Sequence, residues 1–96
     1  MGVMATHKRL CAFLKDARIN SGLTQRDLSD SLGYTSPQYV SNWERGVSSP
    51  PMDKLYELVR LLKLNPEEIL TILQADQEEL VRRVLKIQRR RPQMAR

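Results

Sequence analysis

Residues 22–46 decide the fold, and they read GLTQRDLSDSLGYTSPQYVSNWERG. In this stretch Leu28 and Leu32 are four residues apart, and Val40 and Trp43 follow at a spacing of three. Apolar residues at these spacings lie on one face of an α-helix and can pack against a core. The stretch therefore predicts two short helices joined by a tight turn.

Residues typical of helix ends flank both predicted helices. Thr24 can cap the first helix, and Asp27 three residues later can complete a weak capping box. Gly33 ends this helix, which should be only about eight or nine residues long. Ser36 can cap the second helix, with Pro37 as its first residue, and a glycine ends it too. Such a pair is a candidate helix-turn-helix, in which one exposed helix enters the major groove of DNA.

Three further helices are predicted around this pair. One runs from about His7 to Asn20 and places four apolar residues on one face, namely Leu10, Phe13, Leu14 and Ala17. Another begins near Pro51, and its inner face is marked by Leu55, Leu58, Val59 and Leu62. Asn65-Pro66 begins a third, which continues through Ile69, Leu70, Ile72 and Leu73. The chain is therefore predicted to be all-α, with a compact five-helix domain over residues 1–75.

Residues 76–96 are expected to form an additional basic amphipathic helix and tail. Asp76 and Glu79 offer another capping box, so this stretch is either a sixth helix or a continuation of the fifth. Three apolar residues are predicted to share one of its faces, Leu80, Val84 and Ile87. That face either packs on its own domain or forms a dimer interface with a second copy. Binding to a membrane surface is a weaker alternative.

The formal net charge of +5 and the sequence pI of about 9.8 suggest a polyanionic partner. Residues 1–63 contain nine basic and six acidic residues, which gives +3. Residues 64–79 contain five acidic and no basic residues (−5), whereas residues 80–96 contain seven basic and no acidic residues (+7). The first 79 residues therefore sum to −2, and the excess positive charge belongs to the C-terminal segment.

Several classes of protein are excluded by composition. One cysteine, Cys11, and one histidine, His7, are too few for a disulfide or for the usual zinc ligands. We expect Cys11 to pack as a small apolar residue rather than to sense redox state, and His7 to be solvated. No glycine-rich phosphate loop, nucleophile–base pair, membrane span or secretory signal is recognisable. We therefore expect a cytoplasmic protein that is not an enzyme and needs no metal or cofactor.

A set of short motifs follows in order along the chain: Leu14-x-x-Ala17-Arg18, Gly22-Leu23-Thr24-Gln25-x-x-Leu28, Leu32-Gly33, Val40-Ser41-x-Trp43-Glu44-x-Gly46, Pro51 and Leu55-x-x-Leu58. Over about Leu14 to Leu70 the chain thereby resembles the lambda-repressor-like, Cro-type (XRE) helix-turn-helix regulators. It departs from their common pattern by one extra residue in the turn, which we place around Tyr34-Thr35.

The resemblance implies a set of DNA contacts. Gln38, Ser41 and Asn42 match positions that face the groove, where glutamine and asparagine can read adenine and serine can bond most bases. Pro37 stands where many relatives have a polar side chain that contacts the bases. Proline can offer only apolar contact, for example to a thymine methyl group. The same side chains would otherwise form a polar helix face in water.

Phosphate contacts are predicted at five positions, which are Gln25, Ser36, Tyr39, Arg45 and Ser48. The Tyr39 ring is equally suited to packing beside the preceding helix, and Trp43 is expected to be a core residue. In the resembled family, residues matching Arg18 and Glu44 form a largely buried salt bridge, and we expect the same structural ion pair here.

These observations predict a sequence-specific transcriptional regulator, of repressor type, that binds double-stranded DNA as a homodimer. Bacterial or phage origin and association with the nucleoid follow from the resemblance. Two alternatives remain open. The first is an antitoxin of the same fold, which would also bind a toxin; the second is a protein-interaction adaptor that no longer binds DNA.

Overall fold

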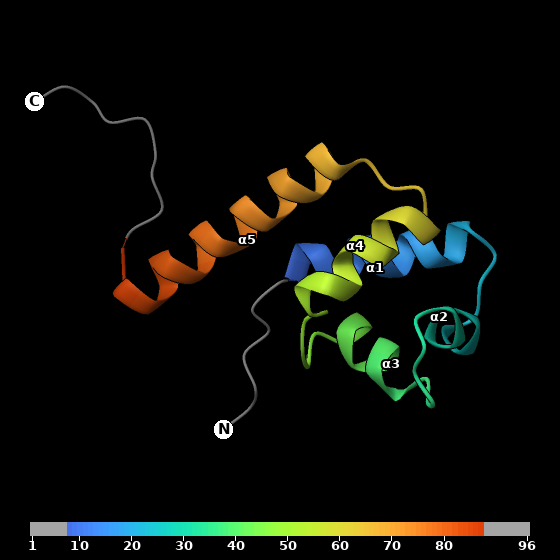
Figure 1. The fold of residues 1–96 in the computed structure, drawn as a ribbon. Helices are drawn as coiled ribbons and strands as arrows, with labels where there is room; N and C mark the ends of the chain where they lie inside the picture. Colours follow the sequence, from blue (N-terminus) through green and yellow to red (C-terminus); the bar gives the residue numbers. More distant parts are fainter. Residues whose placement is uncertain (1–7, 88–96) are drawn as a thin grey trace, which may run out of the picture.

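The computed structural model describes residues 8–87, which form five α-helices and no strand (Figure 1). Their bounds are α1 Lys8–Asn20, α2 Gln25–Ser31, α3 Gln38–Glu44, α4 Met52–Leu61 and α5 Pro66–Leu85. The predicted all-α class is therefore confirmed. His7 and the basic tail from Arg89 onward lie outside the described residues.

One apolar cluster holds the five helices together. Every helix contributes to it, with Leu10, Leu14, Leu28, Leu32, Val40, Trp43, Leu55, Leu58, Leu62 and Ile69 as its buried members. Burial of each large side chain contributes on the order of 1.5–3 kcal/mol. The predicted core position of Trp43 is confirmed, because this side chain is only 3% exposed. Cys11 is buried as well, and burial raises the pKa of its thiol, with the negative charge of Asp76 adding to the effect.

The predicted capping box at the start of α2 is confirmed. The backbone N–H of Asp27 donates to Thr24 Oγ1, and the backbone N–H of Thr24 donates to Asp27 Oδ2, both at 2.9 Å. These bonds lower the pKa of the Asp27 carboxyl. Gly33 follows α2 at a φ of 84°, where a Cβ would be strained. The chain therefore turns sharply enough there to bring α3 beside α2.

The start of α3 differs by one residue from the prediction. The helix begins at Gln38, and Pro37 rather than Ser36 is its N-cap. The reason is that Pro37 supplies the carbonyl for the first helical bond, which it accepts from the N–H of Ser41 at 3.0 Å. Ser36 still acts at this end, since its Oγ accepts the backbone N–H of Gln38 at 3.0 Å. Likewise α2 has seven residues, slightly fewer than predicted.

Within residues 8–87 there is no separate sixth helix, because α5 continues from Pro66 to Leu85 without a break. The division predicted at residues 75 and 76 thus falls inside α5. Asp76 caps a different helix: its carboxylate accepts the backbone N–H groups of Arg9 and Leu10 at 3.2 and 3.1 Å. Two donors in the first turn of α1 are thereby satisfied from a position 66–67 residues further along the chain.

The predicted helix face of Leu80, Val84 and Ile87 needs one correction. Lys86 has a left-handed conformation (φ 60°), and the N–H of Ile87 donates to the carbonyl of Arg82 at 2.8 Å. This pattern closes the helix, so Ile87 lies beyond its end. Leu80 and Val84 remain on α5, whose C-terminal part extends away from the other four helices (Figure 1).

Candidate nucleic-acid interface

The surface predicted to face DNA is organised around α3. Val40 and Trp43 bury one side of this helix in the core. On the helix positions between and around them, Gln38 is exposed and Ser41 and Asn42 are half-buried. The apolar side therefore anchors α3, while amide and hydroxyl groups remain accessible to a ligand.

Three side chains along α3 form a continuous polar row. Asn42 Oδ1 accepts a hydrogen bond from Gln38 Nε2 at 2.9 Å and another from Arg45 Nη2 at 2.7 Å. The row follows helical spacing, because the three residues are separated by four and three positions. Arg45 is predicted to contact a phosphate, yet its guanidinium lies directly beside Asn42, which is a predicted base reader.

A buried ion pair connects α3 to α1. Arg18 Nε donates to Glu44 Oε2 at 2.6 Å and Arg18 Nη2 to Glu44 Oε1 at 3.0 Å, which makes the pair bidentate. The two side chains are only 11% and 4% exposed. The bond to Glu44 raises the pKa of Arg18. Arg18 Nη1 also donates to the carbonyl of Leu23 at 2.7 Å, so the pair fixes the entry to α2 as well.

Gln25 joins this ion pair, which the sequence did not predict. Its Nε2 donates to Glu44 Oε1 at 2.9 Å, and its side chain is half-buried. Glu44 therefore ties the first residue of α2 to the last residue of α3. The predicted phosphate contact of Gln25 would come from a side chain whose amide nitrogen is already oriented by Glu44.

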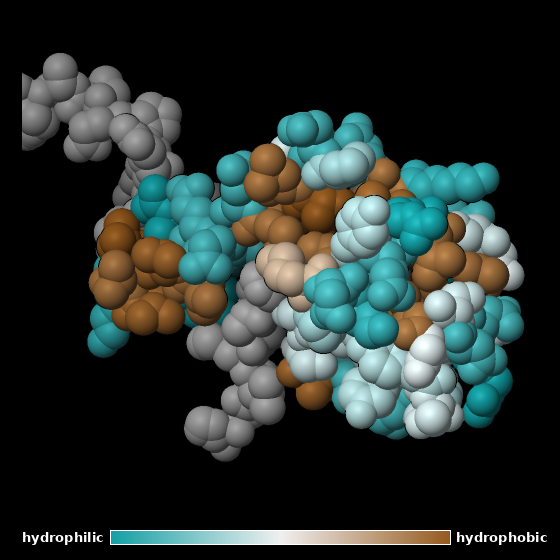
Figure 2. Space-filling model, viewed as in Figure 1, coloured by the Kyte–Doolittle hydropathy of each residue, from teal (hydrophilic) through white to brown (hydrophobic). Residues whose placement is uncertain are grey.

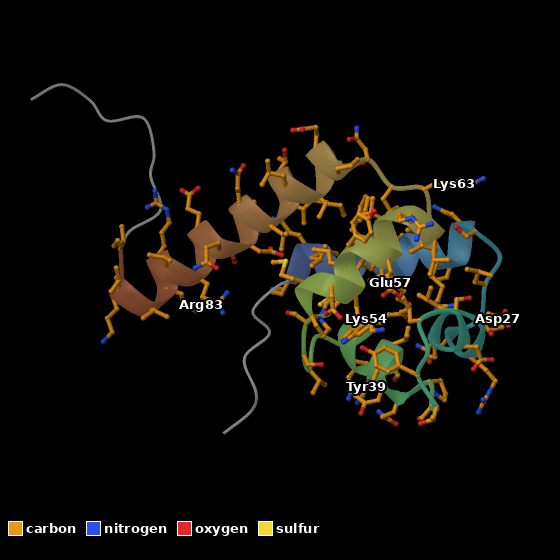
Figure 3. All side chains as sticks on the ribbon, viewed as in Figure 1. Asp27, Tyr39, Lys54, Glu57, Lys63 and Arg83 are labelled. Atoms are coloured by element: carbon orange, nitrogen blue, oxygen red, sulfur yellow. The ribbon has the colours of Figure 1, made fainter. Side chains whose placement is uncertain are left out.

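An aromatic cluster supports the other side of the helix pair. Tyr34, in the turn after α2, stacks on Tyr39 with ring centroids 4.4 Å apart, and it meets Trp43 edge-on at 5.8 Å. Lys54 of α4 lies 5.2 Å from the Tyr34 ring centroid and donates to the carbonyl of Leu32 at 2.8 Å. Figure 3 labels Tyr39 of α3 and Lys54 of α4, which both belong to this region. Tyr34 was not predicted as a functional residue. The sequence signal that could have pointed to Tyr34 was the one extra residue in the turn that contains it.

The remaining predicted contacts lie at the edges of this surface. Tyr39 is half exposed, at 51%, although its ring is stacked on Tyr34. Ser48 is exposed in the loop after α3, and Pro37 and Ser36 are half-buried in the turn before it. Pro37 can offer only apolar contact, whereas the other groups, together with Gln25 and the α3 row, supply neutral hydrogen-bond donors and a single guanidinium. Such donors suit phosphate and base-edge recognition.

Within residues 8–87 no group of histidine, cysteine, aspartate and glutamate is arranged to hold a metal ion. Over the same residues, no helix combines the length and apolar character needed to cross a membrane.

Comparison with known proteins identifies the fold. Residues 14–69, more than half of the chain, match the family described as Helix-turn-helix. The chain belongs to the lambda-repressor-like helix-turn-helix family. Neither the curated proteins nor the solved structures gave a match.

The family match agrees with the geometry. The matched residues begin within α1, contain α2, α3 and α4, and end near the start of α5. They therefore include both partners of the Arg18–Glu44 pair and the whole polar row of α3. This lambda-repressor-like chain is a DNA-binding helix-turn-helix regulator. The C-terminal part of α5 lies outside the family match.

Proposed function

We propose that the chain is a sequence-specific transcriptional regulator of repressor type, which reads operator half-sites in the major groove with α3. The observation that carries the proposal is the polar row of Gln38, Asn42 and Arg45 on a helix whose opposite side is locked into the core. Asn42 can bond adenine in bidentate fashion, and each good base contact discriminates by about 1–3 kcal/mol.

Base reading is assigned to Gln38, Ser41 and Asn42, with apolar contact from Pro37. Phosphate contacts are assigned to the five residues predicted above, Gln25, Ser36, Tyr39, Arg45 and Ser48. Only one of these five residues is charged. Binding of this surface to phosphates would therefore depend more on how hydrogen bonds orient the helix pair than on its net charge. The hydrogen bonds that join Arg18, Gln25 and Glu44 support this assignment because they hold α1, α2 and α3 in one arrangement.

We further propose that the regulator binds paired half-sites as a homodimer, which sets their spacing at about one helical turn of DNA. DNA reading belongs to residues 1–75 in this proposal. Dimerisation, or contact with the DNA backbone, belongs to residues 76–96. A bacterial or phage regulator of this type would act in the cytoplasm, on the nucleoid.

The test is selection of binding sites from a random DNA pool with the parent protein and with Gln38→Ala and Asn42→Ala. Each variant should recover a site in which one or two positions of the parent's consensus are relaxed. Gln74→Ala is the matched control, since this exposed glutamine lies on α5, and it should recover the full consensus. If both α3 variants recover the parent's consensus, the base-reading assignment is wrong.

Footprinting separates this proposal from its alternatives. Protection of a discrete site supports the regulator. Failure to protect any site, together with a stable protein partner, supports the adaptor. Co-purification of a small toxic enzyme with a chain that still protects its site supports the antitoxin.

A further inference from the structure

The polar row on α3 has a fixed direction of hydrogen bonding. Asn42 Oδ1 lies 2.7 Å from Arg45 Nη2 and 2.9 Å from Gln38 Nε2. A guanidinium has only donors, so the Asn42 atom beside Arg45 has to be the amide oxygen. Because that oxygen can only accept, Gln38 has to turn its amide nitrogen toward Asn42. The guanidinium of Arg45 thus decides which end of the Asn42 amide faces into the row.

This arrangement leaves the two ends of the Asn42 amide in different situations. Oδ1 accepts two hydrogen bonds, which occupies both of its lone pairs. In the part of the chain that the structure describes, Nδ2 makes no hydrogen bond to another protein group. The Asn42 side chain therefore offers a ligand N–H donors and no acceptor.

The orientation of this amide is supported by its surroundings. The backbone carbonyl of Asn42 accepts the N–H of Val47 at 2.9 Å, where the chain leaves α3. The bond from Arg45 has a charged donor, which makes it the stronger kind of hydrogen bond. Figure 2 shows a mostly hydrophilic to intermediate surface over the part of the molecule that contains α2 and α3. Contact with DNA excludes water from such a surface and strengthens a charge-assisted bond, so we expect the amide to keep its orientation in the groove.

The four bases differ in what they present to an N–H donor in the major groove. Bidentate contact with adenine needs the amide oxygen for N6–H as well as the amide nitrogen for N7. Guanine presents two acceptors, O6 and N7, so N–H donors alone can bond it. Cytosine presents an amino donor, and thymine presents one acceptor beside its methyl group. Guanine is therefore the base that best fits Asn42 in this arrangement.

We propose that Asn42 reads guanine rather than adenine, because Arg45 holds the amide oxygen of Asn42 inside the polar row. Arg45 is then a positioning residue that sets the base preference of its neighbour. A guanidinium has five N–H groups, so the bond to Asn42 leaves others for the phosphate contact assigned to Arg45. The inference rests on the proposed function, which places α3 in the major groove, and it names the base that one side chain selects.

The first test identifies the base that Asn42 reads. The position of the parent's consensus that Asn42→Ala relaxes should be a G·C pair. Fluorescence anisotropy then compares two duplexes that differ only in whether the guanine of this pair is kept or replaced by adenine. The parent should bind the guanine duplex at least about tenfold more tightly. An A·T pair at this position, equal affinity for the two duplexes, or no position relaxed by Asn42→Ala overturns the proposal.

The second test separates positioning by Arg45 from its contact with phosphate. Arg45→Ala releases Asn42 Oδ1, so the ratio of affinities for the guanine and adenine duplexes should fall by at least about threefold. Arg26→Ala is the matched control, since it removes the same charge from an exposed position on α2, and it should leave the ratio unchanged. If Arg45→Ala weakens binding to both duplexes equally, Arg45 contacts phosphate only and the positioning role is wrong.

A conservative variant tests the chemistry of the amide itself. Asn42→Asp keeps the size of the side chain and an acceptor for Arg45, but it replaces the amide nitrogen with a second acceptor. It should abolish the preference for guanine while circular dichroism shows the parent's helix content and melting temperature. A retained preference for guanine overturns the proposal.

The outcomes distinguish this inference from the function on which it rests. A parent protein that selects no discrete DNA site overturns the proposed function, and the inference with it. A parent that selects a site with an A·T pair at the position read by Asn42 overturns this inference alone.

Discussion

Glu44 connects three helices of the domain through its carboxylate. It accepts hydrogen bonds from Arg18 of α1 and Gln25 of α2 while its own side chain is almost fully buried. A buried charge without its partner is costly, whereas the intact pair is not necessarily more stable than an apolar replacement. The expected role of this ion pair is therefore to fix the relative positions of three helices.

Replacement of Glu44 by alanine should strongly destabilise the fold. It leaves the buried guanidinium of Arg18 uncompensated, at a cost of about 3–5 kcal/mol. For a domain of this size each kcal/mol lowers the melting temperature by about 4–8 °C. Thermal unfolding followed by circular dichroism checks this. Glu57→Ala is the control, because Glu57 forms only a 3.8 Å surface pair with Lys54 and its loss should cost at most about 1 kcal/mol. An unchanged melting temperature for Glu44→Ala would refute the assignment.

A second residue-scale prediction concerns Ser29, whose hydroxyl is buried without a hydrogen-bond partner among the described residues. Ser29→Ala removes this unsatisfied group and should stabilise the protein by about 1 kcal/mol. Ser31→Ala, at an exposed position of the same helix, gains only the better helix propensity of alanine, about 0.5 kcal/mol. Chemical denaturation of both variants separates the two effects. Equal stabilisation would mean that the buried hydroxyl carries no penalty.

At the scale of the helices, the contact between α1 and α5 is a long-range cap. The carboxylate of Asp76 accepts two backbone N–H groups from the first turn of α1 and pairs with the Arg9 side chain at 3.0 Å. Glu79, one turn later, pairs with the same guanidinium at 2.8 Å, which lowers the pKa of Glu79. A helix N-terminus favours negative charge nearby, so both carboxylates stabilise this packing.

Asp76→Ala should therefore weaken the docking of α5 on α1. Loss of a cap costs about 0.5–2 kcal/mol, and the backbone N–H of Leu10 is left without its acceptor in a buried position. Amide hydrogen exchange of the first turn of α1 should accelerate, and the melting temperature should fall. Glu78→Ala is the matched control, since its carboxylate is 66% exposed and bonds only within α5 to Arg82. Similar effects of the two substitutions would contradict a specific capping role for Asp76.

Across the whole molecule, the excess positive charge and the residues proposed to read DNA lie in different parts of the sequence. The stretch from residue 24 to residue 48 contains two basic and three acidic residues, whereas residues 80–96 contain seven basic residues and no acidic ones. Each phosphate neutralised by a basic group steepens the dependence of log affinity on log salt by about 0.9. The salt dependence of binding should therefore depend more on the C-terminal segment than on α3.

A variant ending at Ile87 tests this separation. It removes four arginines (Arg89, Arg90, Arg91 and Arg96) and keeps α5 and Asp76 intact, which a chain ending at Ala75 would not. If the tail reaches phosphates, the slope of log affinity against log salt should fall by about one to four, with an unchanged consensus. Fluorescence anisotropy at several salt concentrations measures the slope. The same slope in both proteins would exclude a phosphate contact of the tail.

Much of this fold could be predicted from sequence because its signals are local. The capping box at Thr24, the turn at Gly33 and the start of α5 at Asn65 each depend on residues within a few positions of one another. Apolar spacing likewise predicted which face of each helix is buried. The Arg18–Glu44 pair was expected only through the family resemblance. The two residues are 26 positions apart in the sequence, and this separation does not by itself indicate a contact.

The sequence by itself determined the five helices, the starts of α2 and α5, the buried faces and the family. Only the tertiary structure decided that Asp76 caps α1, that Gln25 bonds to Glu44 and that Tyr34 stacks on Tyr39. It also decided that α5 runs unbroken past the bundle. The physical reason is that helix ends and faces follow from interactions within one or two turns. Contacts between helices depend on how the whole core packs. Packing brings together residues that are far apart in the chain, and no regular spacing in the sequence indicates which of them will meet.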